Sequence, residues 1–124
     1  MLARALSDLL NHERIGAKSC ELPGSRVIKG VLELLLAHRY IGPIEERTDR
    51  RGSRLTVTLI GAINGCGVIK PRHAIALADY AKFEARYLPA KDFGILIVST
   101  SKGLMDHVAA KAARLGGRLI AYCY

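Results

Sequence analysis

The 124-residue chain contains no tryptophan, and only 6% of its residues are aromatic. Many proteins bind single-stranded nucleic acid by stacking bases on aromatic rings, so this scarcity argues against a stacking platform. The three cysteines lie far apart, with no Cys-x-x-Cys pair and no matching histidine spacing. This pattern argues against a zinc site and against a disulfide framework, and it suits packed, reduced thiols in the cytosol.

Other signatures are missing as well. No apolar run approaches the roughly 20 residues that a membrane-spanning helix needs, and the N-terminus lacks the layout of a signal peptide. We therefore expect a cytoplasmic protein with no membrane partner. The chain has no Walker-type phosphate loop, and Ser99-x-x-Lys102 lacks the companion Ser-Asp-Asn and Lys-Thr-Gly elements of penicillin-binding enzymes. The sequence therefore indicates no catalytic residue, metal site, cofactor or small-molecule substrate.

What the chain has in excess is positive charge. Lysine and arginine number 19 against 11 acidic residues, which gives a formal net charge of +8. Half of the residues are hydrophobic, enough to build a core. A short basic chain that forms a core and lacks a membrane segment is typical of proteins that bind nucleic acid.

The first half of the chain predicts one compact α-β-α-β-β subdomain, residues 1–62. Apolar spacing indicates a first helix that ends at Gly16 and a second that begins after the N-cap Ser25. The second helix should bury a stripe of Val27, Ile28, Val31, Leu32, Leu35 and Leu36. Strands are predicted over residues 17–22, 44–48 and 54–60, the last two forming a hairpin.

The second half, residues 63–124, predicts a mostly β subdomain with one helix. Three glycines in the segment 61–67 mark the boundary. Strands are predicted over residues 68–70, 73–77, 93–98 and 118–124, and a short helix or turn over 79–87. The fold class is therefore α+β, with two small associated α/β subdomains.

A run of small polar residues follows the most apolar strand of the second half. It reads Ser99-Thr100-Ser101-Lys102-Gly103. Met105, Val108, Ala109 and Ala112 recur at helical spacing after it, which predicts a helix that starts at this run and stops at Gly116-Gly117, with His107 on its exposed side. Thr100 or Ser101 could then simply cap the helix, or the run could form an anion-binding turn at the helix N-terminus.

These residues carry a resemblance to a known family. The stretch Phe93–His107, followed by Gly116–Tyr122, resembles the C-terminal signature of the small-subunit ribosomal protein eight family, in its archaeal and eukaryotic branch. Further blocks resemble that family in the same order: Pro23-x-Ser25-Arg26-Val27-Ile28, Tyr40-Ile41-Gly42, Leu59-Ile60-Gly61 and Gly67–Arg72. Together they span essentially the whole chain.

The resemblance implies a function and a set of contact residues. Members of the family have two associated subdomains, are not enzymes, and bind the central domain of small-subunit ribosomal RNA at an irregular stretch of a long helix. They also support subunit assembly beside neighbouring small-subunit proteins. Carried over by position, and joined by nearby cations, the expected RNA-binding residues are Ser99, Thr100, Ser101, Lys102, Gly103, Gly116, Gly117, Arg118, Asn11, Arg14, Lys18, Ser25 and Arg26.

Two alternatives stay open at this point. A small anion-binding enzyme could use residues 99–103 on a phosphorylated substrate, with Lys102 or His107 assisting. Arg50, Arg51 and Arg54, at the predicted hairpin turn, could form a solvated tip or an RNA clamp.

Overall fold

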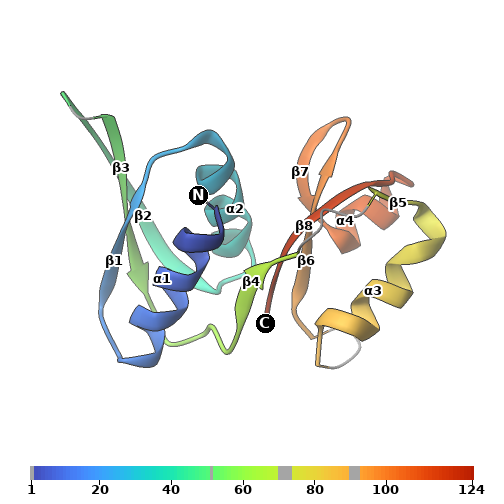
Figure 1. The fold of residues 1–124 in the computed structure, drawn as a ribbon, viewed down its shortest axis with the longest axis horizontal. Coiled ribbons are helices and arrows are strands. Elements are labelled where there is room, and N and C mark those ends of the chain that lie inside the picture. The colour runs from blue at the N-terminus through green and yellow to red at the C-terminus, as the bar shows by residue number, and fades with distance from the viewer. Residues whose placement is uncertain (1, 51, 70–73, 90–92) are drawn as a thin grey trace. The chain divides into compact units, whose positions relative to one another are not determined.

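A computed structural model of the chain describes residues 2–50, 52–69, 74–89 and 93–124 (Figure 1). The chain divides into two units, the first ending at Gly65 and the second beginning at Cys66. This division falls within the glycine-rich segment 61–67. Each unit has its own sheet and its own helices, so the α+β fold class is confirmed.

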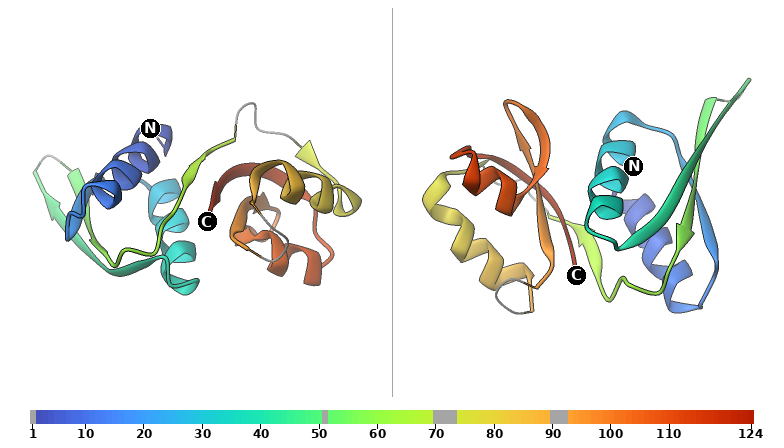
Figure 2. Two further views of the ribbon diagram at one scale, coloured as in Figure 1. Left: turned by 90° about the horizontal axis from the view of Figure 1, so that it is seen from below. Right: turned by 180° about the vertical axis from the view of Figure 1, so that it is seen from behind.

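The first unit is a three-stranded antiparallel sheet with two helices on one face (Figures 1 and 2). The strand order is β1-β3-β2. Its elements are α1 (Leu2–Arg14), β1 (Ser19–Pro23), α2 (Arg26–Ala37), β2 (Ile41–Asp49) and β3 (Gly52–Leu59). The predicted α-β-α-β-β order is thereby confirmed.

Local chemistry explains the helix ends of this unit. Gly16 follows α1 in the left-handed conformation, with φ at +74°, which suits a residue without a Cβ. Ser25 caps α2, because the Ile28 N–H donates to its hydroxyl oxygen at 3.1 Å. The predicted stripe of α2 is too wide, since Val27 and Leu36 are 41% and 39% exposed. These two residues flank a buried stripe at i, i+3, i+4 and i+7 that starts at Ile28, which is the width one helix face can bury.

The second unit is built on a sheet of order β4-β8-β6-β7, with β5 also paired to β8. Its elements are β4 (Cys66–Val68), β5 (Ala74–Ile75), η1 (Leu77–Asp79), α3 (Tyr80–Tyr87), β6 (Ile95–Thr100), β7 (Gly103–Asp106), α4 (His107–Ala112) and β8 (Gly117–Cys123). Both α3 and α4 contribute to one apolar core with strands β6 and β8, through Tyr80, Phe83, Ala110, Val98 and Leu119. Lys70, the last residue of one predicted strand, and His73, the first residue of the next, lie outside the described residues.

The prediction of a strand that leads directly into a helix is wrong. Residues 103–106 pair antiparallel with residues 97–100, so a hairpin strand separates the polar run from α4. The helix begins after Asp106, whose carboxylate accepts from the Ala109 N–H at 3.2 Å, so neither Thr100 nor Ser101 is its cap. Val108 is 55% exposed, and the buried residues of α4 are His107 and Ala110. The apparent helical spacing arose because Met105 lies on the strand β7, whereas Val108, Ala109 and Ala112 lie on the helix α4 that follows it directly.

The glycine pair is not a helix stop. The helix α4 ends at Ala112, and Arg114 takes the left-handed conformation there with φ at 56°. Gly117 instead begins β8.

Cys20, Cys66 and Cys123 are buried, and none of the three forms a disulfide. Burial raises the pKa of the Cys20 thiol above its ordinary value, and the Asp8 carboxylate adds to the shift. Because the thiolate is the reactive form, we expect the native protein to react slowly with Ellman's reagent and to release three fast thiols on unfolding. A thiol that reacts within seconds in the native state would contradict this burial.

Candidate nucleic-acid interface

The polar run forms the turn of the β6–β7 hairpin. Thr100 pairs with Gly103, which leaves Ser101 and Lys102 as the two residues of the turn. The Thr100 hydroxyl donates to the Gly103 carbonyl at 2.8 Å and accepts from the Lys102 N–H at 3.2 Å. Gly103 has a φ of +113°, in a region that residues with a side chain rarely adopt. The turn is therefore closed by its own hydrogen bonds.

The hydroxyls of Ser99 and Ser101 are exposed. Within the part of the chain that the structure describes, neither side chain has a hydrogen-bond partner. A serine hydroxyl can both donate and accept, so each can meet a ribose hydroxyl or a base edge. Thr100 differs, because its hydroxyl is used to hold the turn.

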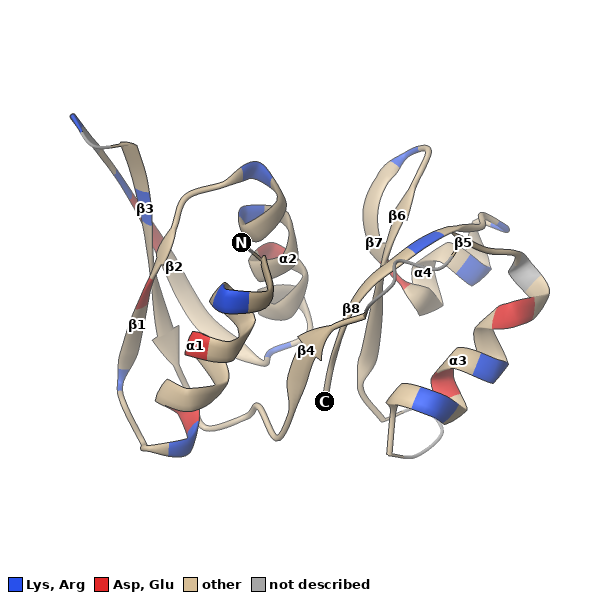
Figure 3. Ribbon diagram, in the orientation of Figure 1, with Lys and Arg blue, Asp and Glu red and all other residues tan. Residues whose placement is uncertain are grey.

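The exposed row next to the turn continues onto β8. Ser99 lies directly opposite Arg118 in the β6–β8 ladder, and side chains of directly opposed residues share one face of a sheet. Both residues are exposed, so a serine and an arginine are presented together on this face. Lys102 is exposed at the adjacent turn. Figure 3 shows a basic residue, in blue, at the tip of the β6–β7 hairpin.

Gly116 and Gly117 allow the start of β8 to approach two neighbouring strands, β5 and β6, closely. A Cβ on Gly117 would lie 2.2 Å from the Ser99 carbonyl oxygen, and one on Gly116 would lie 2.6 Å from the Ile75 carbonyl oxygen. Both distances are far below van der Waals contact, so no side chain fits. The structure thus brings Ser99, Gly117 and Arg118 together with the turn.

The remaining nominated residues lie on the first unit. Asn11 and Arg14 belong to the exposed face of α1, and Lys18 is exposed just after it. Ser25 already accepts the hydrogen bond of the helix cap, which leaves its own hydroxyl proton available to donate. Arg26 is exposed at the first position of α2.

The β2–β3 hairpin carries a further group of arginines. Arg47 and Arg54 face each other directly across the ladder, and both are exposed. Two like charges directly opposite each other repel. The Glu21 carboxylate lies 3.6 Å from Arg54 and offsets part of the repulsion between the two arginines. Arg50 is exposed at the tip, and Arg51 lies outside the described residues.

His107 is buried, at 3% exposure, where the sequence predicted an exposed position. The Leu96 N–H donates to its Nδ1 at 3.1 Å, and its Nε2 lies 3.5 Å from the Glu84 Oε1. The Lys111 ammonium contacts the same carboxylate oxygen at 2.5 Å. These contacts tie α3, α4 and the start of β6 together, so His107 has a structural role.

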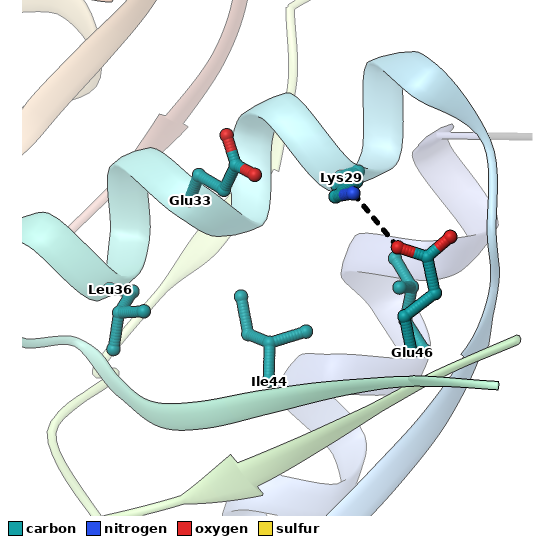
Figure 4. A pocket seen from close by; sticks show the side chains of 6 residues that line it. Lys29, Glu33, Leu36, Ile44 and Glu46 are labelled. Atoms are coloured by element: carbon teal, nitrogen blue, oxygen red, sulfur yellow. Dashed lines mark hydrogen bonds and ion pairs between the residues drawn. The ribbon is translucent and has the colours of Figure 1, made fainter.

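A hollow of about 280 Å³ lies beside α2 and β2 in the first unit (Figure 4). Leu36 and Ile44 form its apolar part, and Lys29 and Glu46 form an ion pair of 2.8 Å at its edge. The hydrogen bond from Lys29, and a second from the Ser53 hydroxyl, lower the pKa of Glu46 below its ordinary value. These charges satisfy each other, and the described residues hold no cluster of His, Cys, Asp and Glu that could bind a metal.

Comparisons with known proteins show which family the chain is similar to. Residues 1–124 match the family model described as Ribosomal protein S8. The small ribosomal subunit protein uS8 of the archaeon Archaeoglobus fulgidus is 45% identical to the chain, over 99% of this chain and 96% of the relative.

The chain belongs to the ribosomal protein S8 family. The predicted resemblance is thus confirmed, and the chain is a structural ribosomal protein. The alternative of a small anion-binding enzyme is excluded, because the match covers the whole chain. None of the helices within the described residues is long and apolar enough to cross a membrane.

Proposed function

We propose that this protein binds an irregular stem in the central domain of small-subunit ribosomal RNA through the β6–β7 turn. In doing so it would support subunit assembly and contact neighbouring small-subunit proteins. The observation that carries the proposal is the pair of exposed, unpartnered hydroxyls of Ser99 and Ser101, seen within the described residues on a turn closed by Thr100.

The chemistry of the turn suits folded RNA. Double-stranded RNA exposes ribose hydroxyls and phosphates in a shallow minor groove, and irregular pairs expose additional base edges. Short hydroxyls can reach these groups, and Gly103 has open space where a Cβ would stand, so the backbone can approach closely. Lys102 and Arg118 would contact phosphates, which strengthens binding without reading the sequence.

The first unit would extend this contact along the RNA backbone. Asn11 and Arg14 present an amide and a guanidinium from α1, and Ser25 and Arg26 present a hydroxyl and a guanidinium at the start of α2. Lys18 adds a further cation. These groups suit phosphate and ribose oxygens, so in the proposal they position the protein, while the turn supplies selectivity.

The decisive experiment compares two RNAs with the full-length protein. One is a central-domain fragment containing the irregular stem, and the other is a regular duplex of equal length. We expect clearly tighter binding to the irregular stem at the same salt concentration, since charge alone would bind both alike. Equal affinities would reduce the interaction to nonspecific attraction and would overturn the proposal.

Replacing Ser101 with alanine should weaken binding to the central-domain fragment by roughly tenfold, because one buried hydrogen bond at the RNA would be lost. The thermal midpoint should stay unchanged, since the Ser101 hydroxyl has no partner among the described residues. Binding by fluorescence anisotropy and melting by circular dichroism would measure both.

The control for this substitution is Thr100→Val, which removes the hydroxyl that closes the turn. It should lower both affinity and thermal midpoint. If Ser101→Ala also lowers both the RNA affinity and the thermal midpoint, Ser101 supports the turn and does not contact RNA.

A further inference from the structure

The outer face of α3 is basic, and its other exposed residues are small. Its exposed residues are Ala81, Lys82, Ala85 and Arg86. Lys82 and Arg86 are one helical turn apart, so they lie on the same side of the helix. Figure 3 shows the corresponding blue bands on α3. Because the alanine side chains are small, a large partner can reach both cations.

The acidic residue in the middle of the helix does not neutralise these cations. The Glu84 carboxylate is only 14% exposed and contacts Lys111 and the Nε2 of buried His107. Within the described residues, neither Lys82 nor Arg86 forms an ion pair. Among the described residues, the two charges on this face therefore have no carboxylate paired with them.

Each of the two cations lies over an aromatic ring. The Arg86 guanidinium lies 5.4 Å from the centre of the Tyr87 ring, and the Lys82 ammonium lies 5.8 Å from that of Phe83. The Tyr87 ring stacks in turn on Tyr122 of β8, with centroids 5.6 Å apart. The guanidinium of Arg86 is a planar fork of N–H donors that can match a phosphate bidentately.

We propose that Lys82 and Arg86 form a second phosphate-binding surface, which contacts the backbone of a strand of small-subunit ribosomal RNA. This surface would work without base recognition, unlike the β6–β7 turn, because cations on an alanine-lined helix face offer charge but no hydroxyl or amide. The inference rests on the proposed RNA-binding function and adds a contact on an element that the sequence indicated only as a short helix or turn.

The test measures how binding of the full-length protein to intact small-subunit ribosomal RNA depends on salt. Each phosphate contact contributes about 0.7–0.9 to the slope of log affinity against log salt concentration. The double variant Lys82→Ala/Arg86→Ala should therefore lower the slope by about 1.5, with an unchanged thermal midpoint because both side chains are exposed. Arg86→Lys should keep the slope and weaken binding, since it keeps the charge and loses the planar donors.

The matched control is Lys29→Ala, which removes one positive charge that already pairs with Glu46 at 2.8 Å. Its slope should equal that of the wild type. An unchanged slope in the α3 double variant would overturn the inference and leave the face to solvent or to an acidic protein segment. A loss about half as large in Lys29→Ala, which removes one charge where the double variant removes two, would also overturn it, because net charge alone would then explain the effect.

The two proposals fail in different ways. If the wild-type protein shows no preference for the irregular stem, the proposed function fails. If the preference is intact and the α3 variants bind with the wild-type slope, only the second surface fails.

Discussion

Replacing Gly117 with alanine is expected to destabilise the protein by roughly 3 kcal/mol or more. The added Cβ would lie 2.2 Å from the Ser99 carbonyl oxygen. That oxygen belongs to the neighbouring strand, so relief requires β6 and β8 to move apart at the Ser99–Arg118 pair. Urea unfolding followed by circular dichroism would measure the loss. RNA affinity should fall as well, because the displaced strand carries the β6–β7 turn.

Gly16→Ala is the matched control for this prediction. Gly16 has a φ of +74° but open space around the position of a Cβ. Its replacement should cost only the backbone strain of a left-handed alanine, about 1–2 kcal/mol, and should leave RNA binding unchanged. If Gly117→Ala costs no more than Gly16→Ala, the close approach of the two strands does not exist in solution.

The sequence predicted the first unit well because its signals are local. The Ser25 cap, the glycine after α1 and the apolar spacing of both helices each act within a few residues. The alternation of Leu55 and Val57 also fixes which face of β3 is buried, and both residues are fully buried. The errors there, such as Val27, concern only the width of a buried stripe.

The second unit was harder to predict because its arrangement depends on distant pairing. A strand that ends in hydroxyls and precedes an alanine-rich stretch fits both a helix cap and a hairpin. The choice is made by the pairing of residues 103–106 with 97–100 and of β8 with β6, which local propensity does not encode. The resemblance nominated the glycine pair, but only the structure gives the reason, a carbonyl oxygen beside each position.

In the candidate site, too, local sequence signals were predicted well and features that depend on the fold were not. The sequence identified the polar run, and the structure separates its hydroxyls into one that closes the turn, at Thr100, and two that are exposed, at Ser99 and Ser101. The basic face of α3 escaped prediction because Glu84 stands between Lys82 and Arg86 in the sequence. Only the fold turns that carboxylate towards His107 and Lys111.

His107→Ala should cost about 2–4 kcal/mol, because it leaves a cavity and removes the acceptor of the buried Leu96 N–H. His107→Phe separates the two effects: it fills the volume, yet leaves the Leu96 N–H without its acceptor. His107→Asn could return an acceptor oxygen and should recover part of the loss. Urea midpoints of the three variants would measure these differences. A cost below about 0.5 kcal/mol for His107→Ala is typical of an exposed residue and would contradict the buried position.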